Sequence, residues 1–290
     1  MKLASFIRNG RATYGGFTNG RLIDLGPKLA SRYPDLKSMI AGGALVESSL
    51  IVSEGAESLS ADDTEFLPVI PNPGKIFCIG VNYADHQKEM GREKSEYPTV
   101  FLRFADTLVG HGQPAWIPKV STSVDYECEL AVIIGKGGRY IEAAHALDHV
   151  AGYTCFNDIS VRDWQRHTTQ FIPGKNFPGT GALGPWMVTT DEILDPHILD
   201  IKTRLNGEVL QDANTEQLIF RIPELIAYLS SFTLLSPGDV IATGTPSGVG
   251  FARNPPLFMK AGDVVEVDIE GIGVLRNRME TEPASGGEGK

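Results

Sequence analysis

Two acidic residues stand two positions apart at the start of an apolar stretch. Glu127 and Glu129 lead into Leu-Ala-Val-Ile-Ile, a run typical of a buried strand. Side chains two positions apart in a strand point to the same face, so both carboxylates are expected to enter one pocket. Carboxylates this close repel unless a cation lies between them, and oxygen ligands favour Mg²⁺, Mn²⁺ or Ca²⁺ over Zn²⁺. The pair therefore predicts part of a metal site.

A third acidic ligand can come from Asp158, which follows another apolar strand. An aspartate after a strand is weak on its own, and a solvated strand face is the ordinary interpretation of a Glu-x-Glu pair. Against that interpretation, the positions that follow Glu129 are apolar on both faces of the predicted strand. We therefore expect the charged end of the strand to meet a pocket rather than water.

Five motifs, taken in order, resemble the fumarylacetoacetate hydrolase family over roughly residues 70 to 275. They are residues 80–86 (GVNYADH), 126–130 (YECEL), 157–165 (NDISVRDWQ), 174–177 (GKNF) and 243–250 (TGTPSGVG). The resemblance implies Glu127, Glu129 and Asp158 as metal ligands and Mg²⁺ or Mn²⁺ as the cofactor. It also implies a mixed β-sandwich roll and a homodimer.

The first motif ends at His86, and Glu89 follows three residues later. On a helix these residues are i and i+3 neighbours, so the carboxylate can orient the imidazole and favour its protonated form. A surface helix with both side chains in water is the alternative. The resemblance implies that the two residues form a water-activating dyad on a lid, and the charged stretch 91–98 is predicted to be its mobile segment.

Cationic and polar residues of the other motifs are candidates for holding a substrate. Lys175 follows Pro-Gly in a predicted loop, and the resemblance implies that it is a cationic active-site group. Arg162, Gln165 and the Thr245 hydroxyl are predicted to bind substrate, Thr245 from a tight glycine-rich turn. A surface lysine, contacts at strand ends and a plain turn are the alternatives. A metal and these cations would let an acidic protein bind an acidic substrate.

Three carboxylates leave an octahedral Mg²⁺ with open positions that a 2-oxo carboxylate can chelate. We predict a divalent-metal-dependent hydrolase of aromatic or sugar-acid catabolism. It would cleave a C–C bond in an acylpyruvate-like or 2,4-dioxo acid through a metal-stabilised enolate. The same site would serve an oxaloacetate decarboxylase or a hydroxymuconate-type isomerase, and a catalytically silent metal-binding protein is a further alternative. The sequence does not identify the acyl group.

Composition and charge limit the partners of the chain. Its 290 residues carry a formal net charge of -10, which opposes the attraction that nucleic acids and anionic membranes require. The three cysteines are widely spaced in apolar sequence and are predicted to be free thiols in a reducing compartment. Neither a signal peptide nor a membrane span is recognisable. We expect a cytoplasmic protein whose partner is a small 2-oxo acid.

The elements that must position these residues are mainly strands. Strands are predicted over residues 3–7, 14–17, 21–25, 75–81, 99–104, 128–134, 150–156, 183–188, 201–205, 240–242 and 264–269, and helices over 82–90, 142–149 and 222–229. Long irregular connections favour a β-rich α+β fold over a doubly wound sheet. We predict a small N-terminal α/β domain (1–70), a catalytic domain (71–280) and a disordered tail (281–290).

Overall fold

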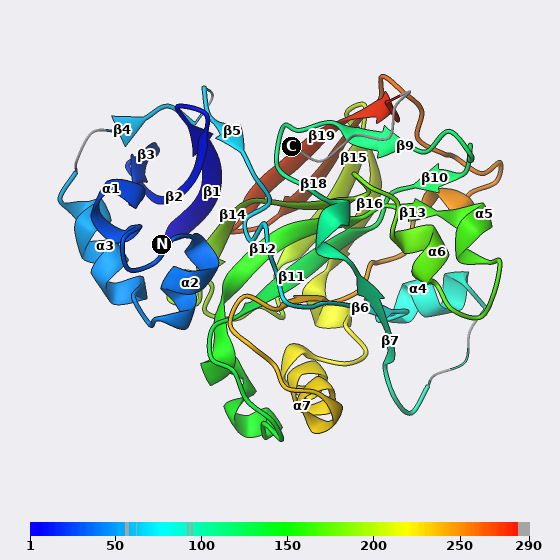
Figure 1. The fold of residues 1–290 in the computed structure, drawn as a ribbon. Coiled ribbons are helices and arrows are strands. Elements are labelled where there is room, and N and C mark those ends of the chain that lie inside the picture. Colours follow the sequence, from blue (N-terminus) through cyan, green and yellow to red (C-terminus); the bar gives the residue numbers. More distant parts are fainter. Residues whose placement is uncertain (56–57, 62, 92, 94, 284–290) are drawn as a thin grey trace.

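The computed structural model describes residues 1–55, 58–61, 63–91, 93 and 95–283 (Figure 1). In the described residues the strands form a twelve-stranded sheet, a five-stranded sheet and one strand pair. The twelve-stranded sheet contains β1 (Lys2–Arg8), β2 (Arg11–Thr18), β3 (Arg21–Asp24), β4 (Ser58–Leu59), β5 (Glu65–Phe66), β6 (Ile76–Gly80), β7 (Thr99–Arg103), β8 (Leu108–Val109), β11 (Cys128–Ile134), β12 (Val150–Asp158), β14 (Gly181–Thr189) and β17 (Val240–Ala242). The β-rich α+β fold class is confirmed.

The remaining strands form a smaller sheet and one strand pair, and the helices lie outside the sheets. The five-stranded sheet contains β9 (Ala115–Ile117), β15 (Asp200–Leu205), β16 (Glu208–Asn214), β18 (Val264–Ile269) and β19 (Gly273–Thr281), and β10 (Val124–Asp125) pairs with β13 (Ser160–Val161). The helices are α1 (Gly26–Leu29), α2 (Leu36–Ala41), α3 (Leu45–Ser53), α4 (Ala84–Glu89), α5 (Arg162–Gln165), α6 (Ile172–Lys175) and α7 (Ile222–Phe232). Helices α4, α5 and α6 gather at the side of the molecule opposite the N-terminal elements (Figure 1).

Strand β11 is buried along its whole length because both of its faces are covered. Leu130 and Val132 pack into the core that includes Val267 of the five-stranded sheet. Ala131 and Ile133 face a second core, which includes the apolar side of α2. A strand between two layers has no solvated face, which explains why its apolar run lacks polar alternation. The polar residues at its beginning are therefore also away from bulk water.

The N-terminal strands are hydrogen-bonded to the main sheet. Strand β1 pairs antiparallel with β14, with Leu3 opposite Met187, and β2 to β4 continue the sheet outward from β1. Helices α1 to α3 lie beside these strands on the same side of the molecule (Figure 1). The division of the chain at residue 70 concerns folding units and stays a prediction.

Several elements differ from the sequence-based expectation. The helix predicted over 142–149 is a 3₁₀-helix over Ala143–His149. Strands β16 and β19 were not expected, although β19 shows a clear alternation of exposed and buried residues. Of the predicted tail, Thr281 still belongs to β19, and residues 284–290 lie outside the described part, as do residues 92 and 94 of the predicted lid.

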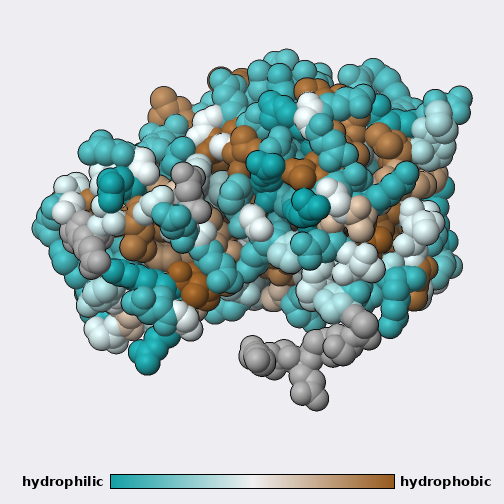
Figure 2. Space-filling view, turned by 90° about the horizontal axis from the view of Figure 1, so that it is seen from above, coloured by the Kyte–Doolittle hydropathy of each residue, from teal (hydrophilic) through white to brown (hydrophobic). Residues whose placement is uncertain are grey.

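The helices and the surface bear on the prediction that the chain has no membrane span. Among the described residues, no helix is both long and apolar enough to cross a bilayer. On the face shown in Figure 2, hydrophobic residues form small groups scattered among hydrophilic ones. Isolated apolar side chains of this kind are normal on protein surfaces.

Candidate active site

Three carboxylates converge where β11 and β12 lie side by side. Glu129 is in β11, Asp158 ends β12, and Glu127 lies one residue before β11 begins. The antiparallel pairing brings them together, since the Asp158 amide donates to the Glu127 carbonyl at 2.9 Å. One oxygen from each carboxylate lies within 4.8 Å of the others, and all three residues are buried.

Each carboxylate has one oxygen held by a donor of the chain. Arg162 Nη1 lies 2.6 Å from Glu127 Oε1, and the Gly244 amide donates to Glu129 Oε2 at 2.9 Å. Arg103 Nε donates to Asp158 Oδ1. These bonds fix the three carboxylates in one orientation each. The other oxygens of Glu127 and Asp158 accept from Lys175.

Lys175 is a buried cation that contacts two of the three carboxylates. Its Nζ lies 2.7 Å from Glu127 Oε2 and 2.6 Å from Asp158 Oδ2. The sequence predicted a loop for this residue, but it ends helix α6, and its side chain is only 1% exposed. A buried ammonium requires paired carboxylates because burial alone disfavours its charge. The assignment of Lys175 as a surface residue is thus excluded by the structure.

The pKa values follow from burial and from these partners. Burial raises the pKa of Glu127, but Lys175 and Arg162 outweigh it and lower that pKa to about 2. Burial and then the charges of Asp158 and Glu127 hold the pKa of Glu129 well above its usual value. Burial lowers the pKa of Lys175, yet the same two carboxylates raise it overall. Lys175 is therefore charged at neutral pH.

The donor set fits a divalent cation. Three buried carboxylate oxygens on one side of a cleft are hard ligands of the kind that Mg²⁺ and Mn²⁺ take. Burial, and then the charges of Asp158 and Glu127, raises the pKa of Glu129, and a divalent ion at this place would favour its charged form. Glu127, Glu129 and Asp158 could thus hold such an ion, as the sequence predicted.

His86 and Glu89 lie on α4 as a bonded pair. His86 Nδ1 lies 2.7 Å from Glu89 Oε2, which matches the i and i+3 spacing on a helix. Glu89 Oε1 accepts from the Gly248 amide at 2.9 Å, so the helix is anchored to the 243–250 turn. Burial raises the pKa of Glu89, but the bonds from His86 and Gly248 lower it overall. His86 is buried and lines the same cleft as the carboxylates.

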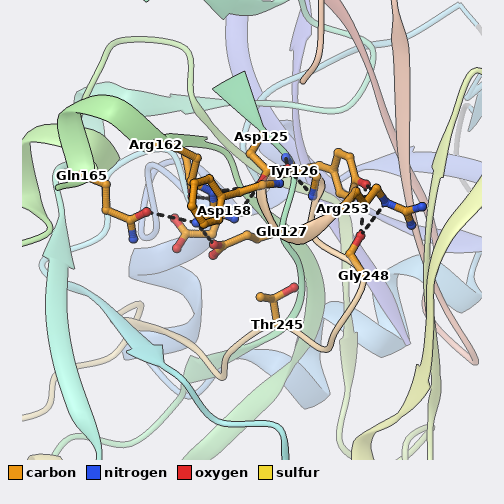
Figure 3. Close-up of polar contacts among 12 residues, drawn as sticks. Asp125, Tyr126, Glu127, Asp158, Arg162, Gln165, Thr245, Gly248 and Arg253 are labelled. Carbon is orange, nitrogen blue, oxygen red and sulfur yellow. Dashed lines mark hydrogen bonds and ion pairs between the residues drawn. The ribbon is translucent and has the colours of Figure 1, made fainter. Parts of the chain in front are cut away.

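The predicted substrate-binding residues also border this cleft. Arg162 and Gln165 are on α5, and Arg162 Nη1 donates to Gln165 Oε1 at 3.0 Å. Thr245 accepts from Gln211 Nε2 at 2.8 Å. Figure 3 shows Arg162 and Gln165 on one side of Glu127 and Thr245 on the 243–250 turn opposite. The structure brings all nine predicted site residues to one place, where all but Glu89 and Asp158 line the cavity.

Two further charged residues organise the site and were not assigned from the sequence. Arg103 ends β7 and is fully buried against Asp158, the Ile159 carbonyl and Thr180. Its only trace in the sequence is a single arginine within an apolar strand. Asp125 accepts from Arg162 Nε at 2.8 Å and from two backbone amides of the 250–251 segment. It directly precedes the 126–130 motif, but nothing in the local sequence indicates its partners.

The cavity between these residues is small. Its volume is about 80 Å³, below the roughly 300–1,000 Å³ of pockets for drug-sized ligands. Charged and polar residues share its lining with apolar ones. Those apolar residues are Ile79, Val81, Met90, Phe101, Phe171 and Phe251.

The chain is similar to proteins of one family over most of its length. The family model "Fumarylacetoacetate (FAA) hydrolase C-terminal" matches residues 75–280. The protein named oxaloacetate tautomerase fahd2, mitochondrial, from Xenopus laevis is 43% identical over 263 residues, which cover 89% of this chain and 82% of that protein. The human protein named oxaloacetate tautomerase FAHD2A, mitochondrial, is 46% identical over 223 residues, or 76% of this chain and 71% of that protein.

Solved structures agree over nearly the whole chain. A fumarylacetoacetate hydrolase from psychrophilic Exiguobacterium antarcticum has a TM-score of 0.87 at 36% identity and covers 97% of this chain and 100% of its own. Maleylpyruvate hydrolase from Sphingobium sp. SYK-6, in complex with manganese(II) ion and pyruvate, has a TM-score of 0.82 at 29% identity, with 98% and 100% covered.

Proposed function

The chain belongs to the fumarylacetoacetate hydrolase family, and we propose that it catalyses keto–enol tautomerisation of a small 2-oxo acid, with oxaloacetate as the first substrate to test. One observation carries the proposal: the buried Lys175 ammonium and the His86 imidazole line the same small cavity. Relatives named as oxaloacetate tautomerases support the choice of reaction and substrate. A cavity of about 80 Å³ favours a short acid over a long acylpyruvate.

The reaction requires an enolate, and the base of the cleft is suited to stabilise one. Glu127, Glu129 and Asp158 would hold Mg²⁺ or Mn²⁺, and when bound this ion would supply positive charge next to the substrate oxygens. A manganese ion is present in the neighbouring maleylpyruvate hydrolase structure. The choice between the two ions belongs to the proposal.

Lys175 is assigned to charge stabilisation rather than to proton removal. Because its pKa is raised, its ammonium stays protonated and cannot accept a proton at neutral pH. A fixed positive charge in a buried site stabilises negative charge that develops on a substrate oxygen. Arg162, held by Asp125 at 2.8 Å, adds a second fixed charge.

His86 is assigned as the base that moves the proton at carbon 3. Its Nδ1 is bonded to Glu89, so in the neutral tautomer Nε2 carries the lone pair. Nε2 takes a proton from carbon 3, the C–H electrons form the enolate, and the imidazolium returns the proton to oxygen to give the enol. Glu89 stabilises the imidazolium during the transfer.

Hydrolysis of a C–C bond is the second candidate, because the same dyad can activate water. The water oxygen would bond to the distal carbonyl carbon of an acylpyruvate, and His86 would accept the water proton. The C–C bond would then break, with its electron pair leaving as the enolate of pyruvate. The structure of maleylpyruvate hydrolase with pyruvate supports this alternative.

One assay separates the candidates. The purified protein, loaded with Mg²⁺ or Mn²⁺, is given enol-oxaloacetate, and the decay of the enol absorbance is followed with an EDTA-treated control. A coupled lactate dehydrogenase assay detects pyruvate. Metal-dependent loss of the enol without pyruvate supports tautomerisation. Pyruvate from oxaloacetate would indicate decarboxylation, pyruvate from an acylpyruvate would indicate hydrolysis, and an unchanged enol decay would refute the proposal.

We also propose a homodimer and a reducing, cytoplasmic location. The buried and free state of Cys78, Cys128 and Cys155 supports a reducing location. Light scattering of the purified protein tests the dimer, and a monomer at assay concentration would contradict it.

A further inference from the structure

Gln211 is a buried polar residue of the five-stranded sheet that reaches the 243–250 turn. It lies in β16 and is 1% exposed, whereas none of the nine predicted site residues belongs to that sheet. The turn packs tightly against β16, because a Cβ atom at Gly248 would lie 2.3 Å from the Leu210 carbonyl oxygen. Gly248 also has a φ of +98°, which favours glycine. The close approach brings the turn within hydrogen-bonding reach of Gln211.

The side-chain amide of Gln211 can take only one orientation. Its Oε1 accepts from the Cys128 amide at 3.0 Å and from the Thr203 hydroxyl at 2.7 Å. Its Nε2 donates to Thr245 Oγ1 at 2.8 Å and to the Pro246 carbonyl at 2.9 Å. A backbone N–H can only donate and a carbonyl can only accept, so exchanging the oxygen and the nitrogen would break both backbone contacts. Both lone pairs and both hydrogens of the amide are thus used.

The fixed amide decides where the Thr245 hydroxyl hydrogen can point. Since Gln211 Nε2 donates to Thr245 Oγ1, that hydrogen cannot point at Gln211. Over the described part of the chain, no protein atom accepts it. Thr245 is 4% exposed and lines the cavity together with Glu127 and Lys175. The hydrogen is therefore available to a ligand in the cavity.

We infer that Gln211 is a positioning residue, which holds the Thr245 hydroxyl as a hydrogen-bond donor to an oxygen of the bound substrate. The inference rests on the proposed function, whose 2-oxo acid carries acceptor oxygens. The sequence predicted Thr245 as a substrate-binding residue, and the structure adds the residue that directs its hydrogen. A hydroxyl fixed before binding loses less rotational freedom than a free one, and a charged acceptor makes the bond stronger.

A purely structural role of Gln211 is the alternative. The Cys128 amide from which it accepts lies between the ligand residues Glu127 and Glu129, so a change of Gln211 could displace the ligands instead. The two roles differ in one respect. An effect through Thr245 disappears when the Thr245 hydroxyl is absent, whereas an effect through the ligands remains. A double-mutant cycle therefore separates them.

Oxalate is a suitable probe because at neutral pH it carries acceptor oxygens and no donor. Its binding to the Mn²⁺-loaded protein is measured by calorimetry, which requires no turnover. The cycle consists of the wild type, Thr245→Val, Gln211→Met and the double variant. Thr245→Val keeps the shape of the side chain but removes the hydroxyl. Gln217→Met is the matched control, since Gln217 is exposed.

We expect Thr245→Val to weaken oxalate binding about tenfold, because a hydrogen bond to a charged oxygen is lost. Gln211→Met should weaken it about fivefold, since the Pro246 carbonyl loses its donor and competes for the Thr245 hydrogen. In the Thr245→Val background, Gln211→Met should have no further effect. Thr245→Ser and Gln217→Met should bind oxalate like the wild type.

An equal loss from Gln211→Met in both backgrounds, or no loss in Thr245→Val, would overturn the inference. If Gln211→Met does not fold, Gln211→Glu replaces it in the cycle. That variant keeps an oxygen for the Cys128 amide and has at most one hydrogen for Thr245 and Pro246. Unchanged enol decay with a wild type whose oxalate cycle behaves as expected would refute the proposed function alone. A metal-loaded wild type that does not bind oxalate would refute both.

Discussion

The N-terminal elements and the base of the cleft both place arginine beside a carboxylate, but in different surroundings. Arg32 and Glu47 form an ion pair with side chains 53% and 43% exposed. Arg103 and Asp158 form one with both side chains 0% exposed. In water the first pair gains little, since solvent and salt screen it. The second pair cannot be solvated, so the Asp158 charge depends on its buried partners Arg103 and Lys175.

The comparison shows that a buried ion pair fixes the positions of its two side chains, whereas an exposed pair does not. At the base of the cleft each carboxylate oxygen that is bonded to a chain donor is fixed in direction, which suits a metal site. In the N-terminal region, stability comes instead from apolar packing and helix capping. Asp35, for example, caps α2 through the Ser38 amide at 2.7 Å.

Removing one arginine from each region is expected to give the largest difference. Arg103→Met removes one of the two buried cations that contact Asp158 and leaves only Lys175, which should lower the free energy of unfolding by about 3 kcal/mol. Arg32→Met should give no measurable change. Urea denaturation measures the free energy of unfolding of both variants. Equal effects would show that burial does not distinguish the two pairs.

Acid should weaken the buried cluster over a defined pH range. The folded-state pKa of Glu127 is lowered to about 2, although burial opposes the shift, because Lys175 and Arg162 lie beside it. Its contribution is complete above the ordinary glutamate pKa of about 4.3 and is lost as the pH falls towards 2. Denaturation curves across this range test it. Lys175→Met should shift this loss of stability to higher pH. If the acid part of the stability curve stays in place, Lys175 is not the group that lowers the pKa of Glu127.

Metal addition should stabilise the cleft. A divalent ion at a hundredfold excess over its Kd should raise the free energy of unfolding by about 2.7 kcal/mol. Asp158→Asn should remove this gain because one of the three ligands is weakened. Lys28→Ala, which breaks an exposed pair with Glu54, should keep it. Thermal unfolding with and without Mn²⁺ is the measurement, and a metal shift that survives in Asp158→Asn would place the ion elsewhere.

The smallest expected effect concerns the helix cap of the N-terminal region. Asp35→Ala should destabilise the protein by about 1 kcal/mol, because the Ser38 amide loses its acceptor. Asp35→Asn keeps an acceptor and should cost less. Neither variant should change the rate of the metal-loaded enzyme. A change in that rate would show that the helix cap and the active site are coupled, whereas we expect them to be independent.

The sequence by itself determined the chemical groups and the strands that carry them. The apolar runs that became β11 and β12 are recognisable because a strand buried on both faces lacks polar alternation. An acidic residue at the end of such a run has no solvated strand face to occupy, which indicates a polar pocket. The β-rich class and the family followed from the same local patterns and from the order of the motifs.

The tertiary structure alone decided which distant groups meet. Arg103 is 55 residues from Asp158, and Asp125 is 37 residues from Arg162. Likewise, the stacking of Arg166 on Phe251 depends on where the 250–251 segment is anchored. Periodicity reports whether a residue is buried, because burial repeats along one element. It does not report the partner, because strand order and layer packing set that choice across the whole chain.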